Sequence, residues 1–137
     1  MDRTLSKKER LYLRDEIEAL FAARSAFVSF PVRVLWLLTP SKPDAPSVKI
    51  LISIPKRRIR RAVRRNRLKR LFREAYRLSK ESFVPLVPEG QTLSLGFVYV
   101  ADEVCTMADA EKALSKARTK LAHLLSPANG TPENDPI

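Results

Sequence analysis

Residues 56–77 read KRRIRRAVRRNRLKRLFREAYR, and they carry the whole net charge of this 137-residue chain. Twelve of them are basic and one, Glu74, is acidic; the 14 basic and 14 acidic residues elsewhere cancel, which leaves the formal charge of +11. A concentrated run of cations repels itself, so it lowers folded stability unless a polyanion neutralises it. The pattern therefore predicts a polyanionic partner, and nucleic-acid phosphate is the obvious one.

The second half of this stretch has the periodicity of a helix over residues 65–78. One apolar stripe, spaced i, i+3, i+4 and i+7, comprises Leu68, Leu71, Phe72 and Ala75. The opposite face comprises Asn66, Lys69, Arg70, Arg73 and Arg77. Because Val63 falls off the stripe, we expect residues 56–62 to form a crossover whose arginines splay beside the helix. Ten of the twelve cations are arginine, whose planar guanidinium can bind phosphate in a bidentate manner and stack on unpaired bases, as in folded RNA.

Three strands flank the basic stretch. Residues 32–38, 48–54 and 92–100 are dense in β-branched and aromatic side chains, and Pro31 marks the start of the first strand. The proline-rich residues 39–47 are expected to join the first two strands as a long hairpin. In the third strand, alternation places two sets on opposite faces: Leu93, Leu95, Phe97 and Tyr99 on one, and Ser94, Gly96 and Val98 on the other.

Two further helices complete the predicted domain. Residues 6–24 form the first, with Ser6 as N-cap and Glu9 at the capping-box spacing, and residues 107–125 form the last. The order α-β-β-α-β-α predicts a single α+β domain, a two-layer sandwich over residues 1–125, followed by a flexible tail at 126–137. The apolar fraction of 45% suits such a domain and is too high for a disordered basic tail.

Composition excludes several classes of protein. Cys105 is the only cysteine, so neither an intrachain disulfide nor a thiolate zinc cluster can form. No apolar run approaches the roughly 20 residues that span a bilayer, and the charged N-terminus lacks a signal core. We therefore expect a cytoplasmic protein that has no membrane partner.

The central motif resembles the signature of the bacterial ribonuclease P protein subunit. Residues 62–70, AVRRNRLKR, contain the Arg-Asn-Arg triplet followed by an apolar residue and Lys-Arg, and residues 71–77, LFREAYR, match the helix behind it. Residues 52–58, ISIPKRR, are similar to the family's strand and its basic exit, and the likeness spans about residues 5–125. Two positions depart from the family pattern: Arg60 or Arg61 replaces a small crossover residue, and Ile17 replaces an aromatic.

The resemblance implies an α+β sandwich with a left-handed strand–helix–strand crossover, against the general right-handed expectation. It also implies that a catalytic RNA, with magnesium bound mainly by that RNA, cleaves precursor tRNA at its 5′ end. No protein residue would then be catalytic or ligate a metal. The implied contacts with the catalytic RNA are Arg57, Arg58, Arg61, Arg64, Arg65, Asn66, Arg67, Lys69, Arg70 and Arg73. The implied groove for the 5′ leader comprises Ile17, Phe21, Phe30, Trp36, Phe97 and Tyr99.

The sequence also allows three other interpretations. A structural RNA-binding protein, of the ribosomal kind and without a role in tRNA processing, has the same electrostatic signature. A DNA-binding regulator fits less well, since no second helix lies close enough before residue 65 to form a helix-turn-helix, so no DNA partner is expected. A protein-only enzyme lacks an acid–base pair: His123 is the only histidine, and the carboxylates of Asp109 and Glu111 fit helix N-terminal charge better than a metal.

Overall fold

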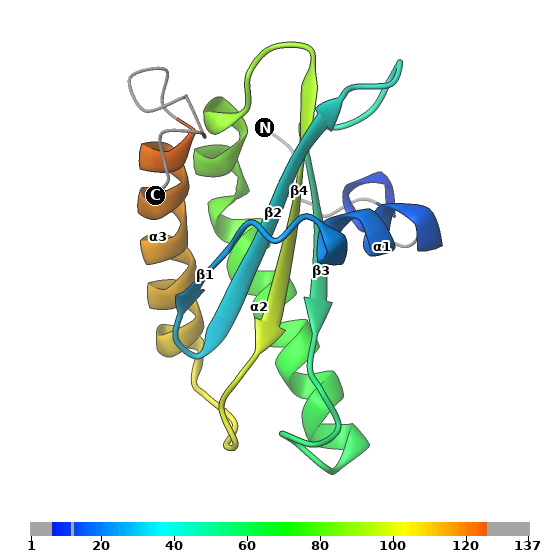
Figure 1. The fold of residues 1–137 in the computed structure, drawn as a ribbon. Coiled ribbons are helices and arrows are strands. Elements are labelled where there is room, and N and C mark those ends of the chain that lie inside the picture. Colours follow the sequence, from blue (N-terminus) through cyan, green and yellow to red (C-terminus); the bar gives the residue numbers. More distant parts are fainter. Residues whose placement is uncertain (1–6, 12, 126–137) are drawn as a thin grey trace.

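The computed structural model, which describes residues 7–11 and 13–125, contains four strands and three α-helices (Figure 1). In chain order they are α1 (Arg14–Ala22), β1 (Ala26–Ser29), β2 (Val32–Pro40), β3 (Val48–Ser53), α2 (Ala62–Phe83), β4 (Gln91–Tyr99) and α3 (Met107–Leu124). Short 3-10 turns lie at Lys7–Glu9 and Val84–Leu86. The predicted N-cap Ser6 and the predicted tail at 126–137 lie outside the described residues.

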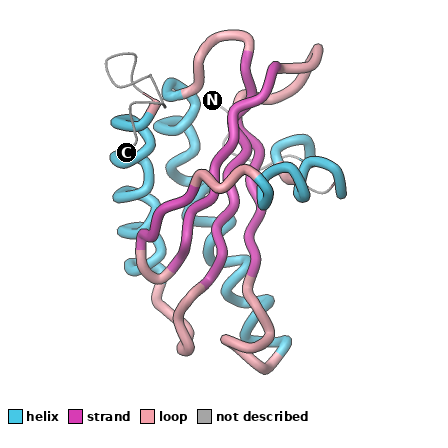
Figure 2. Tube along the Cα trace, in the orientation of Figure 1, coloured by secondary structure: helices cyan, strands magenta, loops and turns pink. Residues whose placement is uncertain are grey.

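β4 occupies the interior of the sheet, whose strand order is β1-β2-β4-β3 (Figure 2). β4 runs antiparallel to β2 and parallel to β3. The predicted hairpin between β2 and β3 is therefore wrong, because β4 lies between them. The physical reason is the burial of β4: residues 92–97 are all buried, and a strand that is covered on both faces belongs inside a sheet.

The N-terminal third also differs from the prediction in two places. The sequence does not predict β1, because Pro31 interrupts the apolar run. Pro31 lies in the turn that joins β1 to β2. The helix predicted over 6–24 begins only at Arg14. The residues before it run beside β3, where the Leu11 amide donates to the Ile50 carbonyl at 2.7 Å, and Leu11 is buried. Pairing with the sheet edge thus replaces the first predicted helical turns.

The β3–α2–β4 unit joins two adjacent parallel strands by a crossover of left-handed sense. Figure 1 shows both strands pointing down, β4 to the left of β3, and α2 returning behind the sheet. Most such crossovers are right-handed, so the handedness implied by the family resemblance is confirmed. The helix α2 begins before the predicted residue 65 and includes Val63 in its first turn. Val63 is 72% exposed, which explains why it does not follow the apolar stripe.

The two faces of the sheet carry different helices. α2 and α3 lie side by side behind it (Figure 1), and the main core lies between them and the sheet. The predicted alternation of β4 is confirmed, because Leu93, Leu95, Phe97 and Tyr99 all face this core. α1 lies on the other face, where Leu20 packs with Leu11 and Leu35 in a second, smaller cluster.

Gly96 lets α1 approach the sheet closely. A Cβ atom at this position would lie 3.0 Å from Leu20 Cδ2, closer than ordinary van der Waals contact. The absence of a side chain on β4 therefore sets the depth at which Leu20 is buried. α1 is held at that depth by few apolar contacts, in contrast to the extensive core on the opposite face.

Truncating Leu20 should loosen α1 from the sheet. Leu20→Ala removes a side chain that is fully buried, so we expect the free energy of unfolding to fall by about 2–5 kcal/mol. Leu13→Ala, which truncates a leucine that is 45% exposed, is the matched control and should cost well under 1 kcal/mol. Urea unfolding of both variants measures the difference, and equal losses would contradict the docking role of Leu20.

Candidate nucleic-acid interface

The first half of α2 packs with one side and presents cations with the other. Leu68, Phe72 and Tyr76 are buried, and the ring of Phe72 meets that of Tyr99 edge-on with 6.1 Å between centroids. On the outer side Arg64, Asn66, Arg67 and Arg70 are exposed, and Arg65, Lys69 and Arg73 are half-buried. The structure thus brings the predicted RNA-binding residues of α2 onto one continuous surface, which we call the arginine row.

The start of α2 is uncompensated in charge. Arg61 is the N-cap residue, and no acidic residue lies in the first helical turn. The amide groups of a helix N-terminus already carry partial positive charge, which carboxylates normally offset. Here Arg61, Arg64 and Arg65 add full positive charges instead. An anion of an external partner is therefore the species that this end of α2 is suited to bind.

At the other end of the row, the charge is neutralised within the helix. Arg77 donates from Nε and from a terminal nitrogen to the two carboxylate oxygens of Glu74, at 3.0 and 2.6 Å. These hydrogen bonds hold the pKa of the Glu74 carboxyl below its ordinary value. Arg77 is thus paired within its own helix, and the cations available to an external partner lie nearer the start of α2.

Arg65 supports the crossover that precedes α2. Its guanidinium donates to the carbonyls of Ile59 and Arg60, at 3.0 and 2.7 Å, and Ile59 is buried. These contacts hold the turn from which Arg60 and Arg61 project into solvent. Arg61 has φ −82° and ψ 127°, an extended conformation open to any residue, so a small residue is not required there.

A groove of about 650 Å³ runs beside the crossover and faces the loop between β4 and α3. Its lining includes Arg58, Arg60, Arg61, Arg64 and Arg67 on one side and Asp102, Glu103 and Val104 on the other. Arg58 Nη1 donates to Asp102 Oδ1 at 3.1 Å. The Nε of Arg58 is buried and has no hydrogen-bond partner among the described residues. Asp102 thus pairs with one of the guanidinium groups that line the groove.

The predicted leader-binding residues do not come together. Ile17 and Phe21 lie on α1, where Phe21 is 49% exposed. Phe30 is 69% exposed but lines a separate cavity of about 700 Å³ beside the β4–α3 loop and Lys112. These three aromatic or apolar side chains therefore belong to two different surfaces.

For Phe97 and Tyr99 the prediction is wrong, because both are buried in the core, and the partly buried Trp36 lies on the same sheet face. All three lie on the sheet face opposite α1, where Phe97 and Tyr99 belong to the core under α2 and α3 and are at most 1% exposed. Successive side chains of a strand point to opposite faces of the sheet. If the wrong alternate residues are assigned to the groove, every one of them lies on the opposite face.

The sheet face on the α1 side, which we call the open face, carries the alternate residues of the strands. It includes Arg33, Lys49, Ser94, Gly96 and Val98, which pair along β2, β3 and β4. These residues were not predicted as a site. The alternation in β4 could have indicated this face. Its bulky apolar side chains face the helical layer, so its smaller or polar residues lie on the open face.

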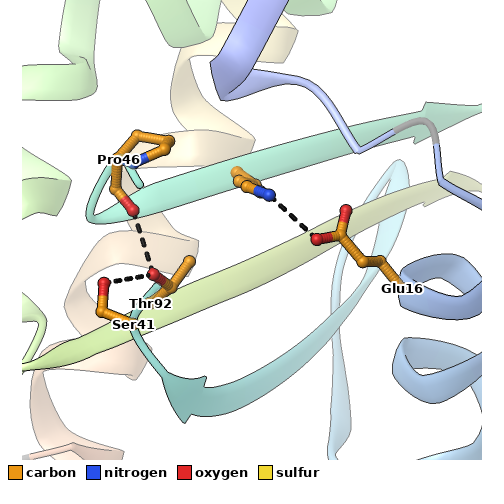
Figure 3. A network of polar contacts seen from close by, with 5 residues as sticks. Glu16, Ser41, Pro46 and Thr92 are labelled. Atoms are coloured by element: carbon orange, nitrogen blue, oxygen red, sulfur yellow. Dashed lines mark hydrogen bonds and ion pairs between the residues drawn. The ribbon is translucent and has the colours of Figure 1, made fainter. Parts of the chain in front are cut away.

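Polar contacts fix α1 beside a cavity of about 600 Å³ on this open face. Lys49 Nζ on β3 lies 2.9 Å from Glu16 Oε2 on α1. Nearby, Thr92 Oγ1 donates to the Pro46 carbonyl at 3.1 Å and lies 2.9 Å from Ser41 Oγ (Figure 3). These bonds join the loop between β2 and β3 to β4, so the walls of the cavity are held by side chains from four segments.

The remaining candidate groups serve structure. Asp109 forms a capping box with Thr106 at the start of α3, and these hydrogen bonds lower the pKa of its carboxyl. Burial raises the pKa of the Cys105 thiol, which keeps it protonated and weakly nucleophilic. Among residues 7–11 and 13–125, no three His, Cys, Asp or Glu side chains group as metal ligands would. In the same part of the chain, no helix is long and apolar enough to cross a membrane.

The arginine row and the sheet behind it define an α+β protein with one strongly cationic surface, of the kind found in proteins that bind nucleic acid. The family model described as Ribonuclease P matches residues 5–125. The chain therefore belongs to the ribonuclease P protein family.

Individual relatives agree with this assignment. The chain is 44% identical over 119 residues to the ribonuclease P protein component of Porphyromonas gingivalis, which covers 86% of each chain. The corresponding protein of Chlorobium phaeobacteroides is 37% identical over 90 residues, covering 64% of this chain and 62% of that one.

Solved structures share the fold at low sequence identity. The RNase P protein of Staphylococcus aureus superposes with a TM-score of 0.61 at 15% identity, covering 86% of this chain and 98% of that one. The RNase P protein of Thermotoga maritima gives a TM-score of 0.60 at 21% identity, covering 82% and 96%.

Removing the charge of Asp102 should strengthen RNA binding. Asp102→Asn frees Arg58 from its ion pair and removes a carboxylate from the groove, so we expect affinity for structured RNA to rise about two- to five-fold. Glu111→Asn, a charge-matched change on the exposed side of α3, is the control. Filter binding at fixed salt measures both variants. Weaker binding by Asp102→Asn would show that Asp102 orients Arg58 instead of competing for it.

Proposed function

We propose that this chain is the protein subunit of ribonuclease P, and that it supports maturation of the tRNA 5′ end by binding RNA. The observation that carries the proposal is the arginine row on a chain that belongs to this family. The row offers guanidinium groups that can bind phosphates, and Asn66 offers an amide among them. A structured RNA, whose phosphates lie on a folded surface, matches such an extended set of donors.

In this proposal the RNA subunit carries the chemistry. The described residues supply cations but no nucleophile with a neighbouring base. Magnesium, held mainly by the RNA, would activate water and stabilise the leaving oxygen. The chain's own contribution is to bind the catalytic RNA through the arginine row, which lowers the repulsion between that RNA and its substrate. A compartment that contains precursor tRNA, the cytoplasm, is the expected location.

The substrate's 5′ leader is assigned to the open sheet face. This face carries the exposed Arg33 for a phosphate, whereas Lys49 is paired with Glu16, and the exposed ring of Phe21 on α1 can stack on a base. Leu20 of α1 covers Gly96, so the accessible part of the face lies beside α1, where Val98 is partly exposed. A single strand of RNA can use such a surface, because it binds through cations along its backbone and aromatic rings on which its bases stack. The leader groove is thus proposed on the side of the sheet opposite the main core.

Reconstitution tests the proposed activity directly. The full chain, mixed with the ribonuclease P RNA of the same source at low magnesium, should raise the rate of precursor-tRNA cleavage well above that of the RNA alone. The expected product ends at the mature 5′ terminus, which gel analysis resolves. Tight RNA binding without any gain in cleavage would favour a purely structural RNA-binding protein.

The salt dependence of binding tests the arginine row. Arg64→Gln combined with Arg67→Gln should weaken binding to the RNA subunit and flatten the plot of log affinity against log salt by roughly 0.7–0.9 per lost phosphate contact. Lys120→Gln, on the exposed side of α3, changes charge away from the row and should leave the slope close to that of the unmodified chain. Equal slopes for the double variant and the unmodified chain would remove both arginines from the interface.

A further inference from the structure

Two arginines that are 63 positions apart in the sequence meet at the outer edge of β3. Arg10, from the segment before α1, and Arg73, from the middle of α2, line one small cavity of about 100 Å³. The rest of its lining is apolar and comprises Leu11, Ile50, Leu51 and Ile52. No carboxylate belongs to this lining, although folded proteins normally compensate a guanidinium that is partly withdrawn from water.

The position of Arg10 is set by the backbone. Arg10 forms a bridge with Ile50 of β3, the next amide, Leu11, donates to the Ile50 carbonyl, and the Leu11 side chain is buried. Its other neighbour, Glu9, is directed to Lys80 of α2, with 3.1 Å between the carboxylate oxygens and Nζ. Glu9 thus anchors the segment to α2 while Arg10 is left beside Arg73.

Arg73 is equally constrained. It follows the buried Phe72 on α2, and its side chain is half-buried against the β3 edge. Neither Arg73 nor Arg10 takes part in an ion pair with a described residue. Burial, and then the positive charges of Arg10 and Arg70, lower the pKa of the Arg73 guanidinium. The two cations therefore repel each other in the free protein, and an anion bound between them would offset that repulsion by attracting both.

The cavity lies where the arginine row meets the edge of β3. Arg67, Arg70 and Arg73 follow one another at intervals of three along the arginine row, so Arg73 is its continuation toward the sheet. The cavity wraps the β3 edge, since Ile50 and Ile52 belong to the helical face and Leu51 to the open face. A strand of RNA that passes from the arginine row to the open sheet face has to round this edge.

We propose that Arg10 and Arg73 form a clamp for one phosphodiester group of an RNA strand, at the junction between the arginine row and the open sheet face. The inference rests on the proposed function for the identity of the strand, which is either the catalytic RNA or the 5′ leader. The clamp itself depends only on two guanidinium groups that converge on an anion. Each guanidinium can donate two hydrogen bonds to phosphate oxygens.

The first experiment uses the free protein and inorganic phosphate. Arg10→Gln, Arg73→Gln, the double variant and the control Lys120→Gln are melted with and without phosphate at constant ionic strength, and each is compared with its own phosphate-free melting temperature. The unmodified chain and the control should be stabilised by phosphate, and all three clamp variants should be stabilised less. An equal rise in every protein would overturn the clamp. A variant with a lower melting temperature still tests the clamp, because only the increase in melting temperature caused by phosphate is compared.

The second experiment uses the holoenzyme and locates the strand. Loss of the clamp should weaken RNA binding roughly ten-fold or more, since hydrogen bonds between charged groups are removed. The double variant should lose less than the product of the single losses, because both arginines bind the same phosphate. A loss in affinity for the RNA subunit assigns the phosphate to that RNA. A loss confined to leader-bearing precursor tRNA, and absent for mature tRNA, assigns it to the leader.

The two proposals fail in distinguishable ways. If the unmodified chain does not activate the catalytic RNA, the proposed function fails, while the phosphate-dependent stabilisation still tests the clamp. If activation is normal but the clamp variants bind both RNAs as tightly as Lys120→Gln does, the clamp is refuted and the proposed function stands.

Discussion

The packing of α2 on β4 is the contact on which the rest of this structure depends. Phe72 and Tyr76 of α2 are buried with Phe97 and Tyr99 of β4, and burial of four such aromatic side chains stabilises the fold by several kcal/mol on an area basis. That stabilisation has to offset the mutual repulsion of the cations on the outer side of the same helix. A weaker inner face could not hold the arginine row in one orientation, so the apolar stripe is a precondition for binding.

The same packing divides the sheet into a closed face and an open one. Because the bulky residues of β4 all turn toward α2 and α3, the opposite face is left with Gly96, Ser94 and Val98. α1 is held there by Leu20 and by the ion pair between Lys49 and Glu16. Beside this lightly attached helix the face stays partly accessible at Arg33 and Val98, whereas the closed face is covered by α2 and α3.

The cations of the basic stretch have separate roles. Arg65 holds the crossover, Arg58 pairs with Asp102, and Arg77 pairs with Glu74. Exposed residues such as Arg64 and Arg67 retain their charge for an external partner. The net charge thus overstates the number of groups available to RNA, and the geometry indicates which ones those are. Arg10 joins them from outside the basic stretch, since its own segment pairs with the β3 edge.

The sequence alone predicts three features: the amphipathic helix behind the Arg-Asn-Arg motif, the alternation of β4 and the concentration of charge. Each of them depends on the spacing of neighbouring residues. The family resemblance added the handedness of the crossover. Only the tertiary structure decided that β4 lies between β2 and β3, that Phe97 and Tyr99 face the core, and that Arg10 meets Arg73. These features depend on contacts between segments far apart in the chain. Local periodicity shows that a strand has two faces, but the partners that fold against it determine which face is buried.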